Sequence, residues 1–470
     1  MEALLEPSLG LGGRAVLFLC LAIALGFEFV NGFHDTANAV ATVIYTNALR
    51  PTVAVVLSGI CNFCGVFMGG IGVAIGIMSL LPVELLVSSG VGAGLAMVLA
   101  LLLAAISWNL GTWYLGLPAS SSHTLIGAIL GVGVANSLMP GHKFGDGVSW
   151  SKAADIGLSL LISPLFGFTM AALLLLLIKR FTRTKGLLAA PPKGLPPPPG
   201  TRSLLIATCC GVSFAHGSND GQKGVGLVML ILIGLVPAGF AIDASATPEQ
   251  LARTVQAADN ITAIVRDHHD KSSEAVADKT IDHLGKIHHY IEGRTSPADI
   301  PPEDRFHFRQ SVLLADKSVG DMVKGGHLGL TSEESKKLAD ERKVLRSLTD
   351  YAPRWVLVAI ALALGIGTMV GWKRIVVTVG EKIGKSHLTY AQGASAELVA
   401  ASTIGVAAWL GLPVSTTHVL SSGIAGTMVA QRSGLQHSTV RNIGLAWILT
   451  LPAVMTLSAL FFLLFRALLG

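Results

Sequence analysis

The sequence predicts an all-α, multi-pass membrane protein made of two inverted repeats with broken helices or hairpins, and with about 10–12 membrane helices. Three observations support this fold class. Hydrophobic residues make up 51% of the 470 residues and charged residues only 13%, whereas soluble domains average about a quarter charged residues. Several apolar runs are long enough to cross a bilayer, which takes about 20 helical residues. Two pairs of motifs recur in the two halves of the chain.

The apolar runs are continuous and do not alternate with polar residues, so they indicate helices and not strands. They cover residues 14–33, 53–80, 92–114, 154–178, 203–235, 354–372, 390–410 and 443–465. The first run continues into a polar motif without a small-residue cleavage site, so we expect it to be retained in the protein. The net charge of +5 is small for this length and argues against a nucleic-acid partner.

Two polar segments divide the chain. We assign residues 1–180 to repeat 1, 181–202 to a Pro-rich basic linker, 203–240 to the start of repeat 2, 241–352 to a soluble helical insert and 353–470 to the rest of repeat 2. The insert contains seven of the fourteen histidines. A metal-collecting surface is therefore an alternative to an ordinary solvated helical insert.

The positions of the basic residues suggest an orientation, because short cytoplasmic loops concentrate Lys and Arg. The linker and the loops that contain Arg50, Lys373 and Arg432 should then be inside, and the loop around Glu84 outside. These assignments agree if each half crosses the membrane an odd number of times, which makes the halves antiparallel. Both termini and the insert are then expected outside.

The strongest repeat pairs LGLPASSSH, residues 115–123, with LGLPVSTTH, residues 410–418. A weaker repeat pairs NGFHDTANAVAT, residues 31–42, with HGSNDGQKGVGL, residues 216–227. The second alignment matches Asp35 with Asp220 and Gly32 with Gly217. Each half therefore contains first a segment with an aspartate and later a Pro-Ser-Ser/Thr segment.

The aspartate motifs place polar groups on one helix face inside apolar runs. In the first half these are Asn31, Asp35, Asn38 and Thr42; in the second they are His216, Asp220 and Lys223. A carboxylate at membrane depth costs about 2.5–3.5 kcal/mol on insertion scales, so it usually faces a partner, water or an ion path. A polar contact that merely holds helices together is the alternative. The glycines around Asp35 and Asp220 permit a broken helix, whose free amide groups would attract anions.

The hydroxyl motifs follow Pro118 and Pro413. Proline at a helix start, followed by hydroxyl and amide donors, suits an oxyanion. The candidate binding residues in these motifs are Ser120, Ser121, Ser122, Ser415, Thr416 and Thr417. Helix capping and close helix packing are the alternative explanation for a single copy, but two copies in a chain with two buried aspartates favour a binding site.

Buried aspartates beside an anion make sense if a cation or a proton accompanies that anion. Lys223 aligns with Asn38, so its ammonium could replace a bound cation in one half or contact the anion directly. The candidates for binding or passing the coupling ion are Asp35, Asp220, His34, His123, His418 and Glu397. Histidines that simply pack between helices are an equal alternative for His123 and His418.

NGFHDTANAVATVIYTNAL and FAHGSNDGQKGVGLVMLILIG resemble the duplicated signature of the inorganic phosphate transporter (PiT) family. LGLPASSSHTLIGA and LGLPVSTTHVLSS resemble its paired hairpins. The similarity is greatest to the bacterial low-affinity phosphate carriers and covers essentially all the apolar segments. Because four long motifs occur in the family's order, the resemblance is specific.

This resemblance implies a secondary active transporter, not an enzyme, that imports inorganic phosphate across the cytoplasmic membrane by alternating access. Phosphate would bind between the halves. The implied binding residues are Asp35 and Asn38 from the first motif, Asn219 and Asp220 from the second, and the six hydroxyl residues of the hairpins. Lys223 is a further candidate for phosphate binding, because it aligns with Asn38.

The bacterial branch is thought to use protons and to accept phosphate as a neutral complex with a divalent metal such as magnesium, whereas other branches use sodium. The chain departs from the widespread signature at His34 and at Gly221-Gln222-Lys223. These departures argue against sodium and fit proton coupling. The resemblance implies no resident cofactor, and it leaves open whether the protein itself binds a metal.

Two other classes of protein remain as alternatives. A membrane phosphate sensor could use the insert as its sensing domain. An intramembrane hydrolase could use Asp35 with Asp220, or Ser122 with His123, but no GxSxG or HExxH motif is present. The expected partners are phosphate, protons and the lipid bilayer, and a homodimer remains open.

Overall fold

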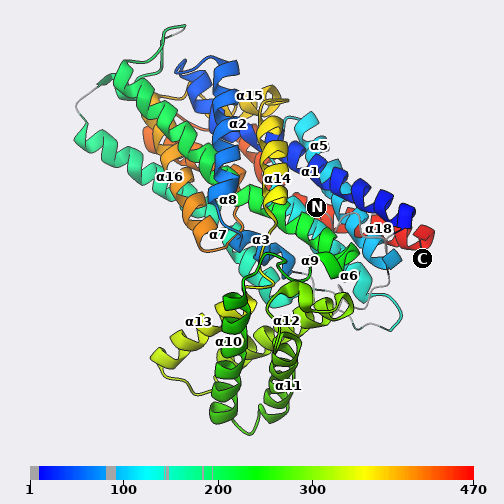
Figure 1. Ribbon diagram of the computed structural model, residues 1–470. Coiled ribbons are helices and arrows are strands. Elements are labelled where there is room, and N and C mark those ends of the chain that lie inside the picture. The colour runs from blue at the N-terminus through cyan, green and yellow to red at the C-terminus, as the bar shows by residue number, and fades with distance from the viewer. Residues whose placement is uncertain are drawn as a thin grey trace. The chain divides into compact units, whose positions relative to one another are not determined.

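The computed structural model describes residues 10–80, 91–141, 143, 145, 148–182, 185–192 and 194–469. Within these residues the regular structure is helical, apart from one isolated β-bridge between Gly384 and Leu435 (Figure 1). The predicted all-α class is therefore confirmed. The loop around Glu84, which we expected outside the membrane, lies outside the described residues.

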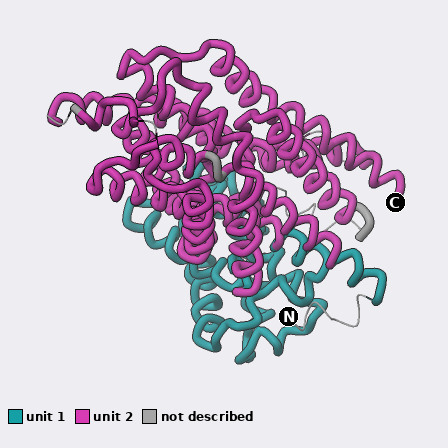
Figure 2. Tube along the Cα trace, turned by 90° about the horizontal axis from the view of Figure 1, so that it is seen from above, with its two compact units in different colours: residues 1–17, 86–88, 229–353 teal, residues 18–85, 89–228, 354–470 magenta. Residues whose placement is uncertain are grey.

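The chain divides into two compact units (Figure 2). The smaller unit consists of residues 229–353 together with the described part of residues 1–17. The larger unit consists of the described parts of residues 18–85, 89–228 and 354–470. The smaller unit includes the whole of the segment 241–352 that the sequence analysis treats as a soluble insert.

The insert is a bundle of four helices with its own hydrophobic core (Figure 1). The helices are α10 (Pro248–His268), α11 (Glu274–Ile291), α12 (Pro302–Lys324) and α13 (Ser332–Arg346), preceded by the short α9 (Pro237–Phe240). Capping boxes at Thr247 and Thr331 begin α10 and α13 by satisfying backbone N–H groups that have no partner within the helix. The insert is thus built as an independent packing unit.

Three histidines of the insert lie near carboxylates, and His288 lies near both Asp259, at 4.0 Å, and Glu292, at 3.8 Å. His268 lies 3.5 Å from Glu334, and His327 lies 3.0 Å from Asp270. The hydrogen bonds from His327 and Ser272 hold the pKa of Asp270 below its usual range. Among the described residues, no three ligating side chains of the insert come together in the way that a metal site needs.

Five described helices are long and apolar enough to cross a membrane. They are α1 (Gly10–Tyr45), α2 (Pro51–Met68), the part Gly94–Tyr114 of α5 (Val91–Tyr114), α7 (Trp150–Phe181) and α18 (His437–Leu469). A sixth span is formed if α14 (Arg354–Thr368) and α15 (Lys373–Glu381), which meet at 65°, count as one. The sequence predicts about 10–12 membrane helices, which exceeds these six. That number stays a prediction, because it requires shorter or more polar helices to span the membrane as well.

The two LGLP segments are the turns of two helical hairpins. The first joins α5 to α6 (Ser121–Ser137), and the second joins α16 (Tyr390–Trp409) to α17 (Thr416–Gln431). Gly116 and Gly411 have φ values of 68° and 70°, which favour glycine in both turns. Ser120 and Ser415 then cap the following helices by accepting hydrogen bonds from the amides of His123 and His418. The sequence repeat is therefore also a repeat of local structure.

The breaks that we expected beside the aspartates are not present, because α1 and α8 (Pro199–Leu235) continue through both motifs. The glycines of these motifs serve close packing instead. A Cβ atom at Gly217 would overlap the backbone of Asn62 on α2, and one at Gly32 would overlap the backbone of Leu364 on α14. Small residues at such positions let helix backbones approach closely.

Close contacts of this kind define three groups of helices in the larger unit. The aspartate group comprises α1, α2, α8 and α14, and in it Gly59 of α2 also lies against Gly365 of α14. The first hairpin group comprises α5, α6 and α18, and the second hairpin group comprises α7, α16 and α17. Within the aspartate group, the start of α8 lies at the end of α1, since Arg202 donates to the carbonyl of Ala48 at 2.8 Å. The two aspartate helices are therefore antiparallel, as inverted repeats require, although the repeat itself stays a prediction.

Replacing Gly217 by alanine should destabilise the larger unit by about 1–3 kcal/mol, because the added methyl group has to displace the backbone of α2. Gly211→Ala on the same helix is the matched control, since its Cβ would lie at an ordinary 3.5 Å from Ala401. Thermal unfolding of both purified variants in detergent measures the difference. Equal melting temperatures for the two variants would contradict the packing role of Gly217.

Candidate functional site

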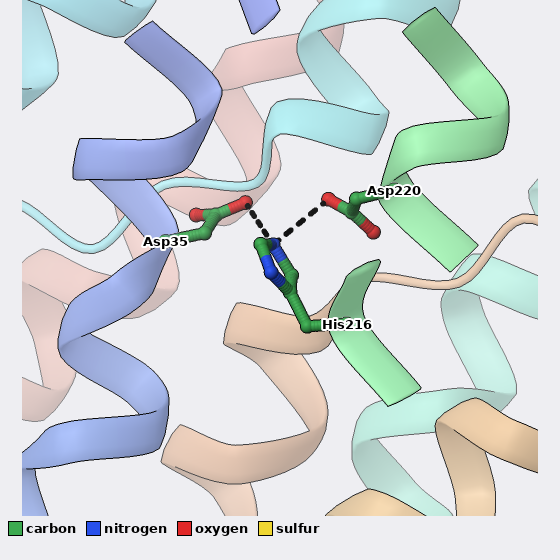
Figure 3. A group of neighbouring side chains, drawn as sticks. All are labelled: Asp35, His216 and Asp220. Atoms are coloured by element: carbon green, nitrogen blue, oxygen red, sulfur yellow. Dashed lines mark ion pairs between the residues drawn. The ribbon is translucent and has the colours of Figure 1, made fainter. Parts of the chain in front are cut away.

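Three buried ionisable side chains meet where α1 and α8 lie side by side (Figure 3). Nε2 of His216 lies 3.9 Å from Oδ2 of Asp35 and 3.4 Å from Oδ2 of Asp220. His216 and Asp220 are one turn apart on α8, so both point toward Asp35 on α1. All three side chains are 4% exposed or less. The two aspartates that the weaker repeat aligns are thus brought together, with His216 between them.

Polar neighbours fix the orientation of the histidine rings. Nδ1 of His216 lies 2.8 Å from the side-chain oxygen of Asn62, so Nδ1 is the donor and Nε2 faces the carboxylates. His34 approaches Asp35 from another direction, with Nδ1 at 3.0 Å from Oδ1 and Nε2 at 3.2 Å from the hydroxyl of Thr112. Asp35 therefore lies between two imidazoles, either of which stabilises a negative charge when protonated.

Lys223 neutralises part of the charge of this cluster. Its Nζ lies 2.6 Å from Oδ1 of Asp220 and donates to the hydroxyl of Ser122 at 2.5 Å. The side chain is buried, with only 1% of the residue exposed. A buried ammonium is tolerated when a carboxylate pairs with it. With Lys223 charged, the two aspartates retain one negative charge, which a proton on His216 or a bound cation can compensate.

Hydroxyl groups of both hairpins donate to the carboxylates. Ser121 of α6 donates to Asp35 at 2.7 Å and to Asp220 at 3.2 Å. Thr417 of α17 donates to Asp35 at 2.9 Å, and Asn38 donates to Thr417 at 2.9 Å. The structure therefore unites both aspartates, Asn38, Lys223 and hydroxyls from each hairpin, as the sequence repeats predict.

Other predicted residues are buried nearby and have structural contacts of their own. Ser120 and Ser415 are the helix caps, and Thr416 lies in the first turn of α17. Ser122 also donates to the carbonyl of Val414 at 2.7 Å. Asn219 donates to the carbonyl of Leu412 at 3.0 Å, so it attaches the second hairpin to α8.

The remaining coupling-ion candidates do not join the Asp35–His216–Asp220 cluster directly. The rings of His123 and His418 lie 4.6 Å apart, and His418 stacks on Trp447 at 4.0 Å. Nδ1 of His123 lies 2.9 Å from the hydroxyl of Ser120. Glu397 accepts a hydrogen bond from Thr208 at 2.5 Å. His123 and His418 thus pack against each other between the two hairpins, with Trp447 of α18 on the far side of His418. Glu397 of α16 contacts α8 about three turns before Asp220.

His216, Asn62 and Thr112 lie at the site but were not predicted from the sequence to be binding residues. His216 could have been found, because it precedes Asp220 by one helical turn inside the repeated motif. Asn62 and Thr112 are isolated polar residues in apolar runs, so nothing in the sequence connects them with the aspartates. Their position at the site follows only from the packing of α2 against α8 and of α5 against α1.

The cluster has the donor atoms of a cation site. One oxygen each of Asp35 and Asp220 and one nitrogen of His216 lie within 4.8 Å of one another. Carboxylates and neutral imidazole are common ligands of divalent cations. The same three groups also bind protons, so the site can exchange one kind of positive charge for another. The hydroxyls and Lys223 alongside provide donors for an anion.

Residues 31–458 match the model of the phosphate transporter family. The chain belongs to the phosphate transporter family. This transporter is 44% identical over 476 residues to the low-affinity inorganic phosphate transporter PitA of Escherichia coli strain K12, with 94% of this chain and 95% of PitA covered. It is 42% identical to PitB of the same strain over the same shares of the two chains. The family resemblance is thus confirmed, and so is the prediction that the chain is not an enzyme.

More distant comparisons agree with the fold. A probable low-affinity inorganic phosphate transporter of Bacillus subtilis is 28% identical over 443 residues, with 94% of this chain and 95% of that protein covered. A solved structure titled "The sodium-dependent phosphate transporter" superposes with a TM-score of 0.56 at 19% identity, covering 97% of this chain and all of that one. At this identity the likeness supports the fold alone. The protein is a multi-pass membrane protein.

Changing Lys223 to asparagine should raise the KM for phosphate by about tenfold or more, since a hydrogen bond to a charged group contributes about 1.5–3 kcal/mol. The change also leaves Asp220 without its ammonium partner. Uptake measured over a range of phosphate concentrations checks the KM. Lys152→Asn, at an exposed position of α7, is the control. Unchanged transport by Lys223→Asn would remove Lys223 from the site.

Proposed function

We propose that the protein imports inorganic phosphate across the cytoplasmic membrane, as a neutral complex with a divalent metal such as magnesium and coupled to protons. One observation supports this function above the others: two buried carboxylates joined by His216 face hydroxyl groups from both hairpins. The substrate comes from membership of the phosphate transporter family and from the relatives, which are inorganic phosphate transporters.

The charges explain why a metal suits this site. A phosphate ion alone would be repelled by Asp35 and Asp220, whereas a divalent cation between them attracts both the carboxylates and the phosphate. The cation of the complex would bind to Asp35, His216 and Asp220, whose ligand atoms lie close enough together. The phosphate oxygens would accept from Lys223 and from the hydroxyls of Ser121, Ser122, Thr416 and Thr417, on the hairpin side of the carboxylates.

The same geometry supports proton coupling. Because the metal–phosphate complex is neutral, the two aspartates and Lys223 together still carry one negative charge when the complex is bound. A proton that enters together with the complex compensates this charge, and both are released on the inner side. Lys223 already provides a fixed positive charge in the second half of the site. Because this ammonium already compensates the charge of Asp220, a sodium ion is not needed there to neutralise the carboxylate. Sodium coupling is therefore the weaker alternative. A sensor would bind phosphate with the same groups but would not move it.

Radiolabelled phosphate uptake into proteoliposomes tests the proposal. We expect uptake under an inward proton gradient, an increase when magnesium is added, and little response to a sodium gradient. Asp35→Asn and Asp220→Asn should each abolish uptake, because they remove a metal ligand and a negative charge.

Each other outcome has a definite meaning. Uptake that needs sodium would keep the carrier and overturn proton coupling. Uptake that magnesium does not change would overturn the metal–phosphate complex. Binding of phosphate without any flux, by folded protein, would favour the sensor.

A further inference from the structure

A second cavity of the larger unit lies where α14 bends into α15, outside the site described above. Its volume is about 230 Å³, and it is lined by Trp113 of α5 and by Gly371, Trp372, Lys373 and Arg374 at the bend. Nε1 of Trp113 donates to the carbonyl of Gly371 at 2.7 Å, which fixes α5 against the bend. Pockets for drug-sized molecules measure about 300–1,000 Å³. The cavity therefore suits a small group or one end of a larger molecule.

Two cations line this cavity, and aromatic rings position both. Cζ of Arg374 lies 5.2 Å from the ring centre of Trp113 and 5.0 Å from that of Tyr114. Nζ of Lys373 lies 5.9 Å from a ring centre of Trp372. These distances are within the range of cation–π attraction, which extends to about 6 Å. Arg374 also donates to the carbonyl of Tyr114 at 3.0 Å. The two positive charges are thus held at the cavity.

These charges have no acidic partner in the described part of the chain. None of the ion pairs there includes Lys373 or Arg374. Both residues belong to the first turn of α15, which contains no acidic residue and has no side-chain cap. The start of a helix carries a partial positive charge, because its first N–H groups have no partner within the helix. Two cations at this end repel that charge, so an anion bound in the cavity would stabilise the arrangement.

The apolar surface beside the cavity indicates which kind of anion fits. The residues next to the lining residues in the sequence are exposed: Tyr114 by 66%, Leu115 by 69% and Val370 by 49%. A free anion gains nothing from such neighbours, whereas a phospholipid has acyl chains beside its phosphate group. Trp and Tyr are enriched where membrane proteins meet the lipid headgroups, and clustered Lys and Arg attract anionic lipids. Cations, aromatic rings and exposed apolar side chains together fit an anionic lipid.

We propose that this cavity binds the phosphate group of an anionic phospholipid, with Lys373 and Arg374 as the donors. An ammonium and a guanidinium can each donate to one of the two charged oxygens of a phosphodiester. The bound lipid would join the start of α15 to the end of α5. The residues of the Asp35–His216–Asp220 cluster do not line the cavity, so lipid binding is independent of the coupling ion.

Native mass spectrometry of the purified full chain in detergent measures the binding. Phosphatidylglycerol is the anionic probe, and phosphatidylcholine, which has no net charge, is the comparison lipid. We expect phosphatidylglycerol to bind more tightly. The double variant Lys373→Gln with Arg374→Gln should weaken its binding by about tenfold or more, because each cation near the lipid headgroups contributes about fivefold to the attraction of an anionic lipid.

A matched control separates the cavity from general surface charge. Lys382→Gln with Lys385→Gln removes the same two charges from exposed positions just after α15, which do not line the cavity. This variant should bind phosphatidylglycerol clearly more tightly than the cavity variant. If the cavity variant unfolds at a lower temperature without lipid, Lys373→Gln alone decides. Its ammonium does not tie α15 to α5, as the guanidinium of Arg374 does, and its loss should cost about fivefold in affinity.

Four results would overturn the proposal. The first is wild-type affinity for phosphatidylglycerol in the cavity variants, and the second is an equal loss in the control variant. The third is thermal stabilisation by inorganic phosphate, without lipid, that the cavity variant loses while it still binds phosphatidylglycerol; this would assign the cavity to a free anion. The fourth is a dimer in the mass spectra that dissociates in the cavity variant, since a second copy of the chain would then cover the cavity.

Discussion

The need to compensate two carboxylates buried in a membrane protein is the constraint on which the rest of the larger unit depends. Asp35 and Asp220 are 2% exposed or less, and unpaired charges at such depth are unstable. Lys223 compensates one of them, and His216 lies between both. Both compensating groups belong to α8, so α1 has to pack against α8 in the one axial register that brings Asp35 next to them. The glycines that let these helices and their neighbours pack closely serve that requirement.

The hairpins meet the same requirement from the other side. Their serine caps use up the hydroxyls of Ser120 and Ser415 in starting α6 and α17. The next hydroxyls along each helix, those of Ser121 and Thr417, are then directed to the carboxylates. One short motif thus builds a helix start and presents a donor to the site. Its two copies give the aspartates hydrogen-bond partners from both halves of the chain.

Much of this arrangement could be predicted from the sequence because polar residues inside apolar runs are rare and therefore informative. Asp35, Asp220 and the hydroxyl motifs stand out for that reason, and they do meet. The predicted helix breaks at the motif glycines were wrong, since the sequence does not reveal whether a glycine ends a helix or admits a neighbouring backbone. Asn62 and Thr112 had no repeated partner to mark them. Their importance arises from helix packing between segments far apart in the chain.

The division into an aspartate group and two hairpin groups does not follow the two halves of the sequence. Each group contains helices from both repeats: α1 and α2 pack with α8 and α14, α5 and α6 with α18, and α7 with α16 and α17. Close backbone contacts within each group oppose sliding of its helices past one another. A rocking of one sequence half against the other would have to break such contacts in all three groups. The motion that opens the site is therefore expected between the groups, with the carboxylates staying in the aspartate group and the hydroxyls of each hairpin moving with the group of that hairpin.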